Sequence, residues 1–303
     1  MASVSVDPVA RPPGRAGRNL WSRVGVGLLL GGVVGLSLFV VRWLFALFVV
    51  AAVVLAVLEI AGALARRALV VPRVLVLAGS VAIVVAATAF GPLGLVVSAT
   101  MAVTAVVLAT LVMPARTPAS PTGTGRGALS VPDARDTAGA IFVIAWIGIL
   151  AGFACLLLRP ADGSWRTFTF ILVVVASDTG GFAAGVLAGR HPMAPHISPK
   201  KSWEGFGGSV VLSVAVAVAA VTFLLHGRWW AGVVLGVAVV LAAVLGDLAE
   251  SMVKRDLGVK DMSSLLPGHG GLLDRLDSML LSAPVAWVVL AVLVAAPGGS
   301  VWR

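Results

Sequence analysis

Residues suited to phosphate chemistry are concentrated in the C-terminal part of the chain. Eight of the thirteen acidic residues follow residue 177, and all four lysines lie between residues 200 and 260. Asp274 and Asp277 are three residues apart, which places them one turn apart on the same helix face. Two carboxylates this close repel each other unless a cation joins them, and hard oxygen ligands supplemented by water and phosphate typically hold Mg²⁺. This pattern predicts a polar site between Asp178 and Asp277.

A second polar segment, Ser198-Pro199-Lys200-Lys201-Ser202-Trp203-Glu204-Gly205, starts with a proline turn and leads into Gly207-Gly208. Two adjacent ammonium groups suit phosphate oxygens, and glycines at a helix N-terminus let backbone amides approach an anion. The alternative is a marker of membrane topology whose lysines contact anionic lipids.

Asp178 falls near the middle of an apolar run, in the sequence Ser177-Asp178-Thr179-Gly180-Gly181. A carboxylate at the centre of a membrane helix costs at least ~2.5 kcal/mol unless it faces water, a counter-ion or a metal. We therefore expect a functional role. The alternative is that the helix breaks at the glycine pair and Asp178 caps the next segment.

A polar helical face begins at Asp247. Its residues, at spacings of i, i+3, i+4, i+7 and i+11, are Asp247, Glu250, Ser251, Lys254 and Gly258. Taken alone, this is a solvated surface with a Glu250–Lys254 pair worth about 0.3–0.5 kcal/mol. The next residues along the chain favour a site instead: Lys260-Asp261, then His269 among glycines in Pro267–Gly271, then Asp274-Arg275. The glycine-rich segment could wrap a phosphate or a nucleotide, or could be a structural turn.

The elements that position these residues are membrane helices. The chain of 303 residues is 59% hydrophobic and 12% charged, with a mean hydropathy of +1.06, which excludes both a water-soluble globular enzyme and a disordered chain. The net charge of +9 is spread thinly, so it does not indicate nucleic-acid binding. Runs long enough to span a bilayer predict an all-α polytopic protein with nine helices: Val24–Val41, Leu44–Ala65, Val74–Phe90, Leu93–Met113, Ala138–Leu158, Phe168–Gly189, Gly205–Leu225, Trp229–Gly246 and Met279–Ala296.

The basic residues predict the orientation of these helices. With a cytoplasmic N-terminus, 17 of the 22 basic residues fall on the inside, which favours an odd number of spans and a C-terminus outside. We expect a disordered cytoplasmic tail (1–20), N-terminal transmembrane helices (21–113), a cytoplasmic linker rich in Pro, Thr, Ser and Gly (114–137), and a C-terminal transmembrane catalytic domain (138–303).

One stretch resembles the signature of the phosphatidate cytidylyltransferase family, also called CDP-diacylglycerol synthases: Ser251-x-x-Lys254-Arg255-x-x-x-x-Lys260-Asp261-x-x-x-x-x-Pro267-Gly268-His269-Gly270-Gly271-x-x-Asp274-Arg275-x-Asp277. The Ser198–Gly205 and Asp178 segments look like companion motifs of that family. Ser202 departs from the more usual threonine but keeps the hydroxyl. The resemblance is strong over residues 170–280 and depends only on hydropathy before residue 140.

The resemblance implies a nucleotidyltransferase of phospholipid biosynthesis, a multi-pass protein of the inner cell membrane, commonly dimeric. Such an enzyme condenses CTP with phosphatidate to give CDP-diacylglycerol and pyrophosphate, and needs Mg²⁺, with a monovalent cation such as K⁺ sharing the site. We expect metal ligands among Asp178, Asp247, Asp261, Asp274 and Asp277. We expect catalytic roles for Lys254, Arg255, Lys260, Asp261, His269, Asp274 and Arg275, and substrate binding by Ser198, Lys200, Lys201, Glu204, Ser251, Gly270 and Gly271.

Two other functions compete with this interpretation. A CDP-alcohol phosphatidyltransferase handles the same lipid, but its DGxxAR-type motif with widely spaced aspartates is absent. A transporter would scatter charges along several spans at depth, whereas here they cluster at the predicted cytoplasmic helix ends. The sequence also contains no P-loop for ATP-driven transport.

Overall fold

The computed structural model describes residues 32, 34–67, 69, 71–112, 134–195, 197–259, 261–263 and 271–295, without the side chains of Arg42, Pro199 and Lys200. The predicted N-terminal tail, half of the first predicted span and most of the linker lie outside these residues. So do Lys260, His269 and Gly270 of the predicted site.

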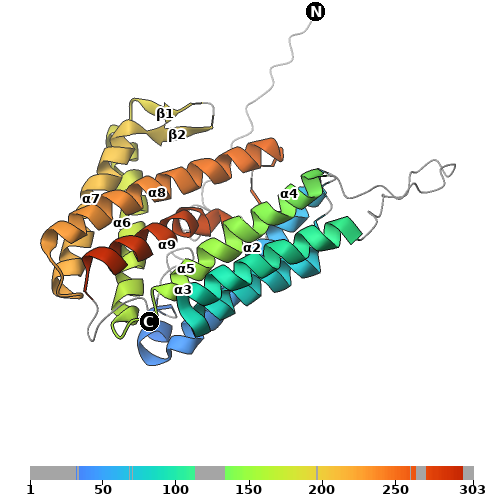
Figure 1. Cartoon of the computed structure of the whole chain (residues 1–303). Coiled ribbons are helices and arrows are strands. Elements are labelled where there is room, and N and C mark those ends of the chain that lie inside the picture. Colours follow the sequence, from blue (N-terminus) through green and yellow to red (C-terminus); the bar gives the residue numbers. More distant parts are fainter. Residues whose placement is uncertain are drawn as a thin grey trace, which may run out of the picture.

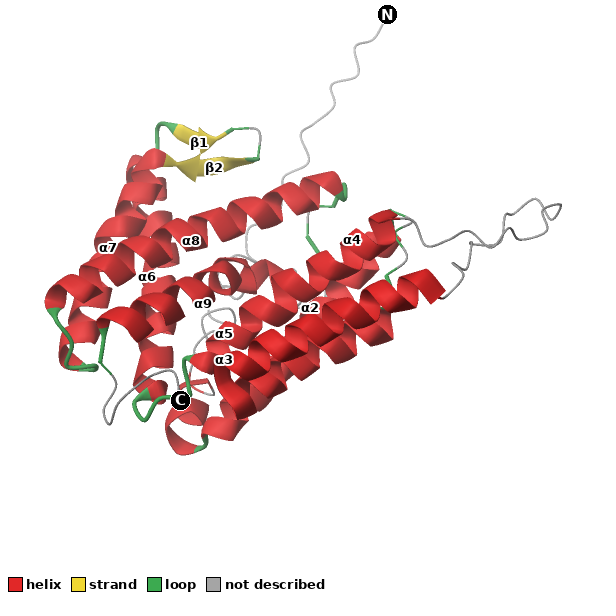
Figure 2. Ribbon diagram, in the orientation of Figure 1, coloured by secondary structure: helices red, strands yellow, loops and turns green. Residues whose placement is uncertain are grey.

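The described chain is almost entirely helical, as predicted (Figure 2). Its helices are α2 (Arg42–Ala65), α3 (Arg73–Val112), α4 (Ala134–Val143), the π-helical turn η1 (Ile144–Ile149), α5 (Leu150–Leu156), α6 (Gly163–Ala188), α7 (Trp203–Phe223), α8 (Trp229–Asp256) and α9 (Leu273–Leu293). In this part of the chain, seven helices are long and apolar enough to cross a membrane, with α4, η1 and α5 counted as one. Figure 1 shows α2, α3 and α4 side by side in one group and α6, α7 and α8 in another, with α9 between them.

Helix α3 reverses direction at Gly91, where the sequence placed a boundary between two spans. Gly91 has φ +72° and ψ −150°, a conformation open to glycine, and Pro92 follows it. The two halves of α3 lie against each other. Gly79 of the first half is so close to Ala102 of the second half that a Cβ on Gly79 would be 2.8 Å from Ala102 Cβ. In a straight helix these two residues would be about 34 Å apart. The guanidinium of Arg159 packs against the bend and donates to Thr88 O over 3.0 Å.

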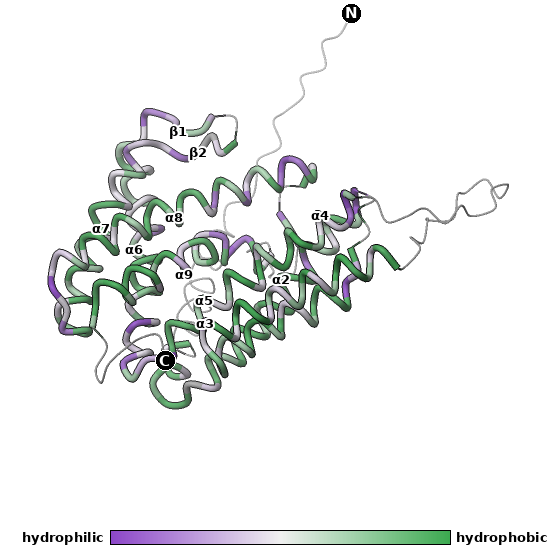
Figure 3. Tube along the Cα trace, viewed as in Figure 1, coloured by the Kyte–Doolittle hydropathy of each residue, from purple (hydrophilic) through white to green (hydrophobic). Residues whose placement is uncertain are grey.

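Two helices extend further at their polar ends than the apolar runs predict. Helix α8 continues past Gly246 to Asp256, and α9 begins at Leu273 instead of Met279. The helical periodicity from Asp247 had predicted a helix there, and this prediction is confirmed. Figure 3 shows hydrophilic stretches at helix ends and along the last part of α8, with hydrophobic residues over most of the remaining helices.

Helices α6 and α7 pack closely through small residues. Gly180 lies against Gly208, and Ser209 Oγ donates to Ser177 O over 2.7 Å. Helix α6 continues without a break through Gly180 and Gly181 to Ala188. The alternative that the helix ends at the glycine pair is therefore wrong, and Asp178 lies within the helix.

A short antiparallel hairpin, β1 (Pro192–Ala194) and β2 (Ser198–Ser202), connects α6 to α7. The proline turn expected at Ser198 is instead the start of a strand, so Lys200 and Lys201 lie in β2. Arg255 at the end of α8 holds the hairpin, because its Nε donates to Ile197 O over 2.6 Å. The hairpin thus lies beside α8 (Figure 1), and Lys201 of β2 pairs with Asp247 where the polar half of α8 begins.

Candidate functional site

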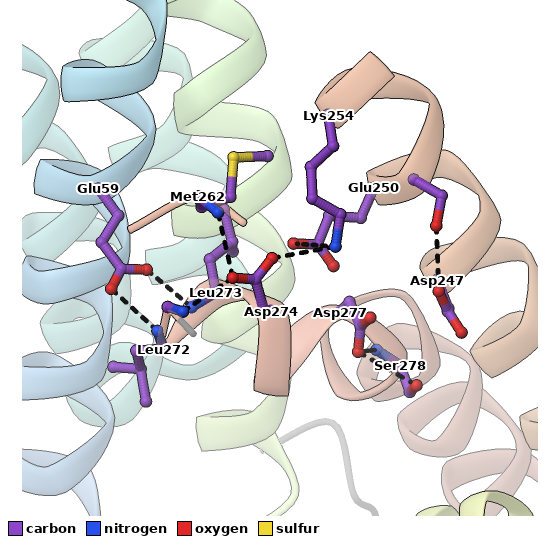
Figure 4. A network of polar contacts seen from close by, with 12 residues as sticks. Glu59, Asp247, Glu250, Lys254, Met262, Leu272, Leu273, Asp274, Asp277 and Ser278 are labelled. Carbon is purple, nitrogen blue, oxygen red and sulfur yellow. Dashed lines mark hydrogen bonds and ion pairs between the residues drawn. The ribbon is translucent and has the colours of Figure 1, made fainter. Parts of the chain in front are cut away.

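The polar ends of α8 and α9 lie against each other. Gly246 allows this approach, since a Cβ there would come within 2.5 Å of Asp277 O. The side chains of Glu250 and Lys254 on α8 therefore face those of Asp274 and Asp277 on α9 (Figure 4). The sequence placed these residues on two separate helix faces, and the structure brings the faces together.

Lys254 lies between two carboxylates. Its Nζ is 3.0 Å from Asp274 Oδ1 and 3.5 Å from Glu250 Oε1. In this arrangement its charge is already neutralised by the protein. A phosphate that binds Lys254 would have to share or replace one of these carboxylates.

Asp274 also holds the chain that precedes α9. Its Oδ2 accepts hydrogen bonds from Gly271 N at 2.8 Å and from Met262 N at 3.1 Å. An acidic residue in the first turn is favourable because it interacts with the partial positive charge of the helix N-terminus. Asp274 therefore joins α8, α9 and the segment around Met262.

Ser278 links the acids of α6 and α9. Its Oγ lies 3.5 Å from Asp178 Oδ1 and 3.3 Å from Asp277 Oδ1, and its backbone N donates to Asp277 Oδ1 over 2.6 Å. A hydroxyl has one proton, so it donates to one of these carboxylates at a time. Ser278 was not among the site residues predicted from the sequence.

Lys201 and Asp247 form the shortest of the described lysine ion pairs, with Nζ 2.6 Å from Oδ2. Asp247 Oδ1 is also within 3.4 Å of Ser251 Oγ. Through this pair, β2 is tied to α8 at the point where its polar half begins.

A pocket of about 230 Å³ lies between the hairpin and α6, α7, α8 and α9. Its polar lining includes Asp178, Lys201, Asp247 and Ser278, and Phe182 is among its apolar residues. Asp178 is close enough to Asp247 and Asp277 to interact with them electrostatically. Three segments that are far apart in the sequence thus contribute charged groups to one pocket.

Glu250 is buried, contrary to the solvated surface that its spacing to Lys254 indicates when taken alone. The residue is 1% exposed, and neither carboxylate oxygen accepts a hydrogen bond from the described residues. Lys254 Nζ at 3.5 Å is its ion-pair partner but does not form a hydrogen bond with it, and a buried acceptor without a hydrogen bond costs about 1–3 kcal/mol. Glu250 is therefore a candidate site residue that was not predicted from the sequence.

The predicted metal ligands fall into three places. Asp178 and Asp247 line the pocket with Asp277 beside Ser278 at its edge, Asp274 contacts Lys254, and Asp261 is exposed in the segment before Met262. Within the described ranges, no three acidic, histidine or cysteine side chains come close enough to form a metal site by themselves. Mg²⁺ in phosphate-transfer sites commonly takes only one or two carboxylates, completed by waters and substrate phosphates.

The remaining predicted residues have different surroundings. Glu204 accepts hydrogen bonds from the backbone N of Arg190 at 3.1 Å and of His191 at 3.2 Å, which closes the base of the hairpin. Arg255 holds the hairpin turn, Ser198 begins β2, and Arg275 is exposed on α9. Glu204 and Arg255 therefore support the hairpin in the present arrangement.

Glu59 of α2 is a second functional candidate that was not predicted. Its carboxylate is 8% exposed and contacts Ser263, Leu272 and Leu273 around the start of α9 (Figure 4). The signal was present in the sequence, because Glu59 is an acid inside the predicted span Leu44–Ala65, where an acid needs a partner. Its partner could not be identified from local spacing.

Comparison with known proteins gives consistent matches. A sequence model of the cytidylyltransferase family matches residues 21–293. A phosphatidate cytidylyltransferase of Mycobacterium leprae is 41% identical over 283 residues, covering 92% of this chain and 90% of that protein. One from Mycobacterium bovis is 41% identical over 280 residues with the same coverage. One from Haemophilus influenzae is 42% identical over 130 residues, which is 41% of this chain and 45% of that protein.

Proposed function

Because the chain belongs to the cytidylyltransferase family, we propose that it transfers the cytidylyl group of CTP to phosphatidate, giving CDP-diacylglycerol and pyrophosphate in phospholipid biosynthesis. The observation that supports this most strongly is the pocket in which Asp178, Lys201 and Asp247 meet, because each comes from a different polar segment. The pocket adjoins helices long and apolar enough to cross a membrane, as an enzyme with one soluble and one lipid substrate requires.

In the proposed reaction, a phosphate oxygen of phosphatidate attacks the α-phosphorus of CTP in line. A new phosphorus–oxygen bond forms, the bond to the β-phosphate oxygen breaks, and pyrophosphate leaves with that electron pair. The attacking oxygen is already anionic at neutral pH, so no strong general base is needed. The main task of the protein is to bring two polyanions together.

Lys201 and Lys254 are the described lysines best placed for this task. Each is now paired with a carboxylate, Asp247 or Asp274, which keeps its ammonium group oriented. Phosphate oxygens would compete with these carboxylates for the same ammonium protons. Lys200, Arg255, Lys260 and Arg275 complete the proposed phosphate-binding set, with His269 and Gly270 in the glycine-rich segment.

Mg²⁺ is part of the proposal. Asp178 and Asp247 line one pocket and Asp277 is close enough to interact with Asp178, and one or two carboxylates completed by waters and substrate phosphates suit Mg²⁺. The buried Glu250 carboxylate beside Asp277, which accepts no hydrogen bond from the described residues, adds oxygen ligands to that set. When bound, such an ion would neutralise phosphate charge and help align the attacking and leaving oxygens. Asp261 and Asp274 remain in the proposed metal set, and a monovalent cation such as K⁺ remains a second proposed ion.

We also propose the finer topology: nine spans, the N-terminus and the active-site loops in the cytoplasm, the C-terminus outside, and a homodimer in the inner membrane. The distribution of basic residues supports this orientation. Cytosolic CTP would then reach the pocket directly. The divisions at residues 20, 113 and 137 belong to the same proposal.

The function is tested with detergent-purified protein, Mg²⁺ and CTP labelled in the cytidine, measuring label that becomes lipid-soluble. With phosphatidate we expect rapid transfer. With diacylglycerol, the matched acceptor that lacks a phosphate, we expect none. A folded preparation that transfers no label to phosphatidate would contradict the proposal, and equal transfer to diacylglycerol would show that the acceptor is wrong.

A further inference from the structure

Glu59 contacts the start of α9 through three hydrogen bonds. Its Oε1 accepts from Ser263 Oγ at 2.6 Å and from Leu272 N at 2.9 Å, and its Oε2 accepts from Leu273 N at 2.9 Å. Glu59 lies on α2, more than 200 residues earlier in the chain. A helix of the N-terminal half thus directly holds the helix that carries Asp274 and Asp277.

These contacts supply the N-terminal cap that α9 otherwise lacks. The first backbone N–H groups of a helix have no partner inside the helix. Leu272, at the N-cap position, has no side chain that can accept a hydrogen bond. Glu59 satisfies the N–H groups of Leu272 and Leu273 from another helix, and its charge suits the positive end of α9.

Gly271 lies between the carboxylates of Glu59 and Asp274. A Cβ at this position would come within 2.9 Å of Glu59 Oε2 and 3.0 Å of Asp274 Oδ2. Gly271 N also donates to Asp274 Oδ2 over 2.8 Å. The short segment from Gly271 to Leu273 is therefore held on one side by Glu59 and on the other by Asp274, so a shift in one contact would move the other.

A second contact from the same part of the chain holds the end of α8. Arg67, just beyond α2, donates from Nε to Leu257 O over 2.9 Å. Gly258 has φ +65°, and a Cβ there would meet the Arg67 guanidinium. Residues near the end of α2 thus contact both the end of α8 and the start of α9, the two helices that carry Lys254 and Asp274.

We propose that Glu59 is a positioning residue for catalysis: by capping α9 from α2, it fixes the Gly271–Leu273 segment and so sets the orientation of the Asp274 carboxylate toward Lys254. This inference rests on the proposed function for its activity readout. Glu59 does not itself face the pocket lined by Asp178 and Asp247. It acts through the backbone of the segment that Asp274 also binds.

The test compares Glu59→Gln with Asp162→Asn. Glu59→Gln keeps the size of the side chain but replaces one acceptor oxygen with an NH₂ donor that faces backbone N–H or hydroxyl donors. Asp162→Asn makes the same kind of change in another largely buried carboxylate, which is ion-paired and accepts from Arg166 Nε at 2.8 Å near the other end of α9. Both variants are purified, the folded fraction and Tm are measured, and kcat and KM for CTP are determined per folded molecule.

We expect Glu59→Gln to lower kcat by about 10- to 100-fold, the scale of a misplaced catalytic group, with KM for CTP changed less than about threefold. Asp162→Asn lowers Tm but leaves kcat within about twofold. A Glu59→Gln kcat within twofold of the wild type would overturn the proposal. So would an equal loss of kcat in Asp162→Asn, because the effect would then reflect general destabilisation.

Ser263→Ala provides a milder variant if Glu59→Gln does not fold. It removes only one of the three donors to Glu59, and we expect kcat to fall by about fivefold, as for loss of one hydrogen bond. Wild-type kcat in this variant would contradict the proposal. The wild-type protein is measured in the same assay. If the proposed function is wrong, none of the proteins transfers label. If only this inference is wrong, the wild-type protein still transfers label.

Discussion

Lys201 Nζ lies 2.6 Å from Asp247 Oδ2, which joins the hairpin to α8 at the pocket. The two residues come from polar segments on either side of α7, and each lines the same pocket as Asp178. In this pair an ammonium group is already held at the pocket, where an incoming phosphate would compete with Asp247 for its protons. The ion pair also limits where the hairpin can lie relative to α8.

Lys201→Met tests whether this ammonium group binds phosphate. We expect kcat/KM for CTP to fall by about 10- to 100-fold, the equivalent of one hydrogen bond to a charged group at about 1.5–3 kcal/mol. Arg190→Gln is the matched control, because it removes an exposed positive charge near the same hairpin outside the pocket lining. Steady-state kinetics measure both variants, and equal losses in the two would indicate only a long-range charge effect.

Asp178→Asn tests the proposed metal set. Asp178 is exposed within α6 and faces the pocket, so we expect the variant to fold. Loss of one of the charges around the pocket should raise the Mg²⁺ concentration needed for half-maximal transfer by tenfold or more, on the scale of about 1.4 kcal/mol per factor of ten. A Mg²⁺ titration of transfer activity measures this, and an unchanged midpoint would remove Asp178 from the metal set.

Glu250→Gln separates stability from function. The wild-type carboxylate is 1% exposed and lacks hydrogen bonds from the described residues, with Asp274 and Asp277 nearby. Replacing it with an amide of the same size removes its 3.5 Å ion pair with Lys254, but Lys254 keeps Asp274 at 3.0 Å, so Tm should change little. Transfer should fall at least about tenfold if the carboxylate serves the site. Thermal unfolding and label transfer are measured on the same preparation. A variant that is less stable than the wild type but fully active would show that Glu250 has only a structural role.

Arg166→Met tests a set of buried contacts that lies far from the pocket. Arg166 is 1% exposed and donates to Asp162 Oδ1 at 2.8 Å, Leu290 O at 2.8 Å and Val294 O at 2.9 Å. Removing one partner of a buried ion pair costs about 3–5 kcal/mol, so we expect a large fall in Tm. The kcat per folded molecule should stay near the wild-type value. A variant with normal Tm would show that these contacts contribute little.

Much of the fold was predictable because local signals were strong. Gly91 and Pro92 marked the reversal in α3, and the spacing from Asp247 predicted the polar half of α8. Hydropathy alone could not place the ends of α8 and α9, because a window of apolar residues stops at the first charges while the helix continues. The hairpin was not predicted, since its short strands contain prolines and lysines that are uncommon in strands.

The sequence indicated which residues belong to the site better than it indicated which of these residues contact each other. Asp178, Lys201 and Asp247 were all singled out by residue type and surroundings, and the structure brings them to one pocket. The contacts of Glu59 were not predictable, because its partners Leu272 and Leu273 lie more than 200 residues away. Glu250 was misjudged because an i, i+4 pair has the same spacing on a solvated face as on a buried one.

The central claim, transfer of a cytidylyl group to phosphatidate, is tested most directly by the fate of two phosphorus labels. The purified protein is given phosphatidate and Mg²⁺ with CTP labelled at either the α- or the γ-phosphorus. We predict that the α-label enters the lipid and that the γ-label appears only in pyrophosphate. Entry of the γ-label into lipid would contradict this claim, because the protein would then transfer the terminal phosphate instead of the cytidylyl group.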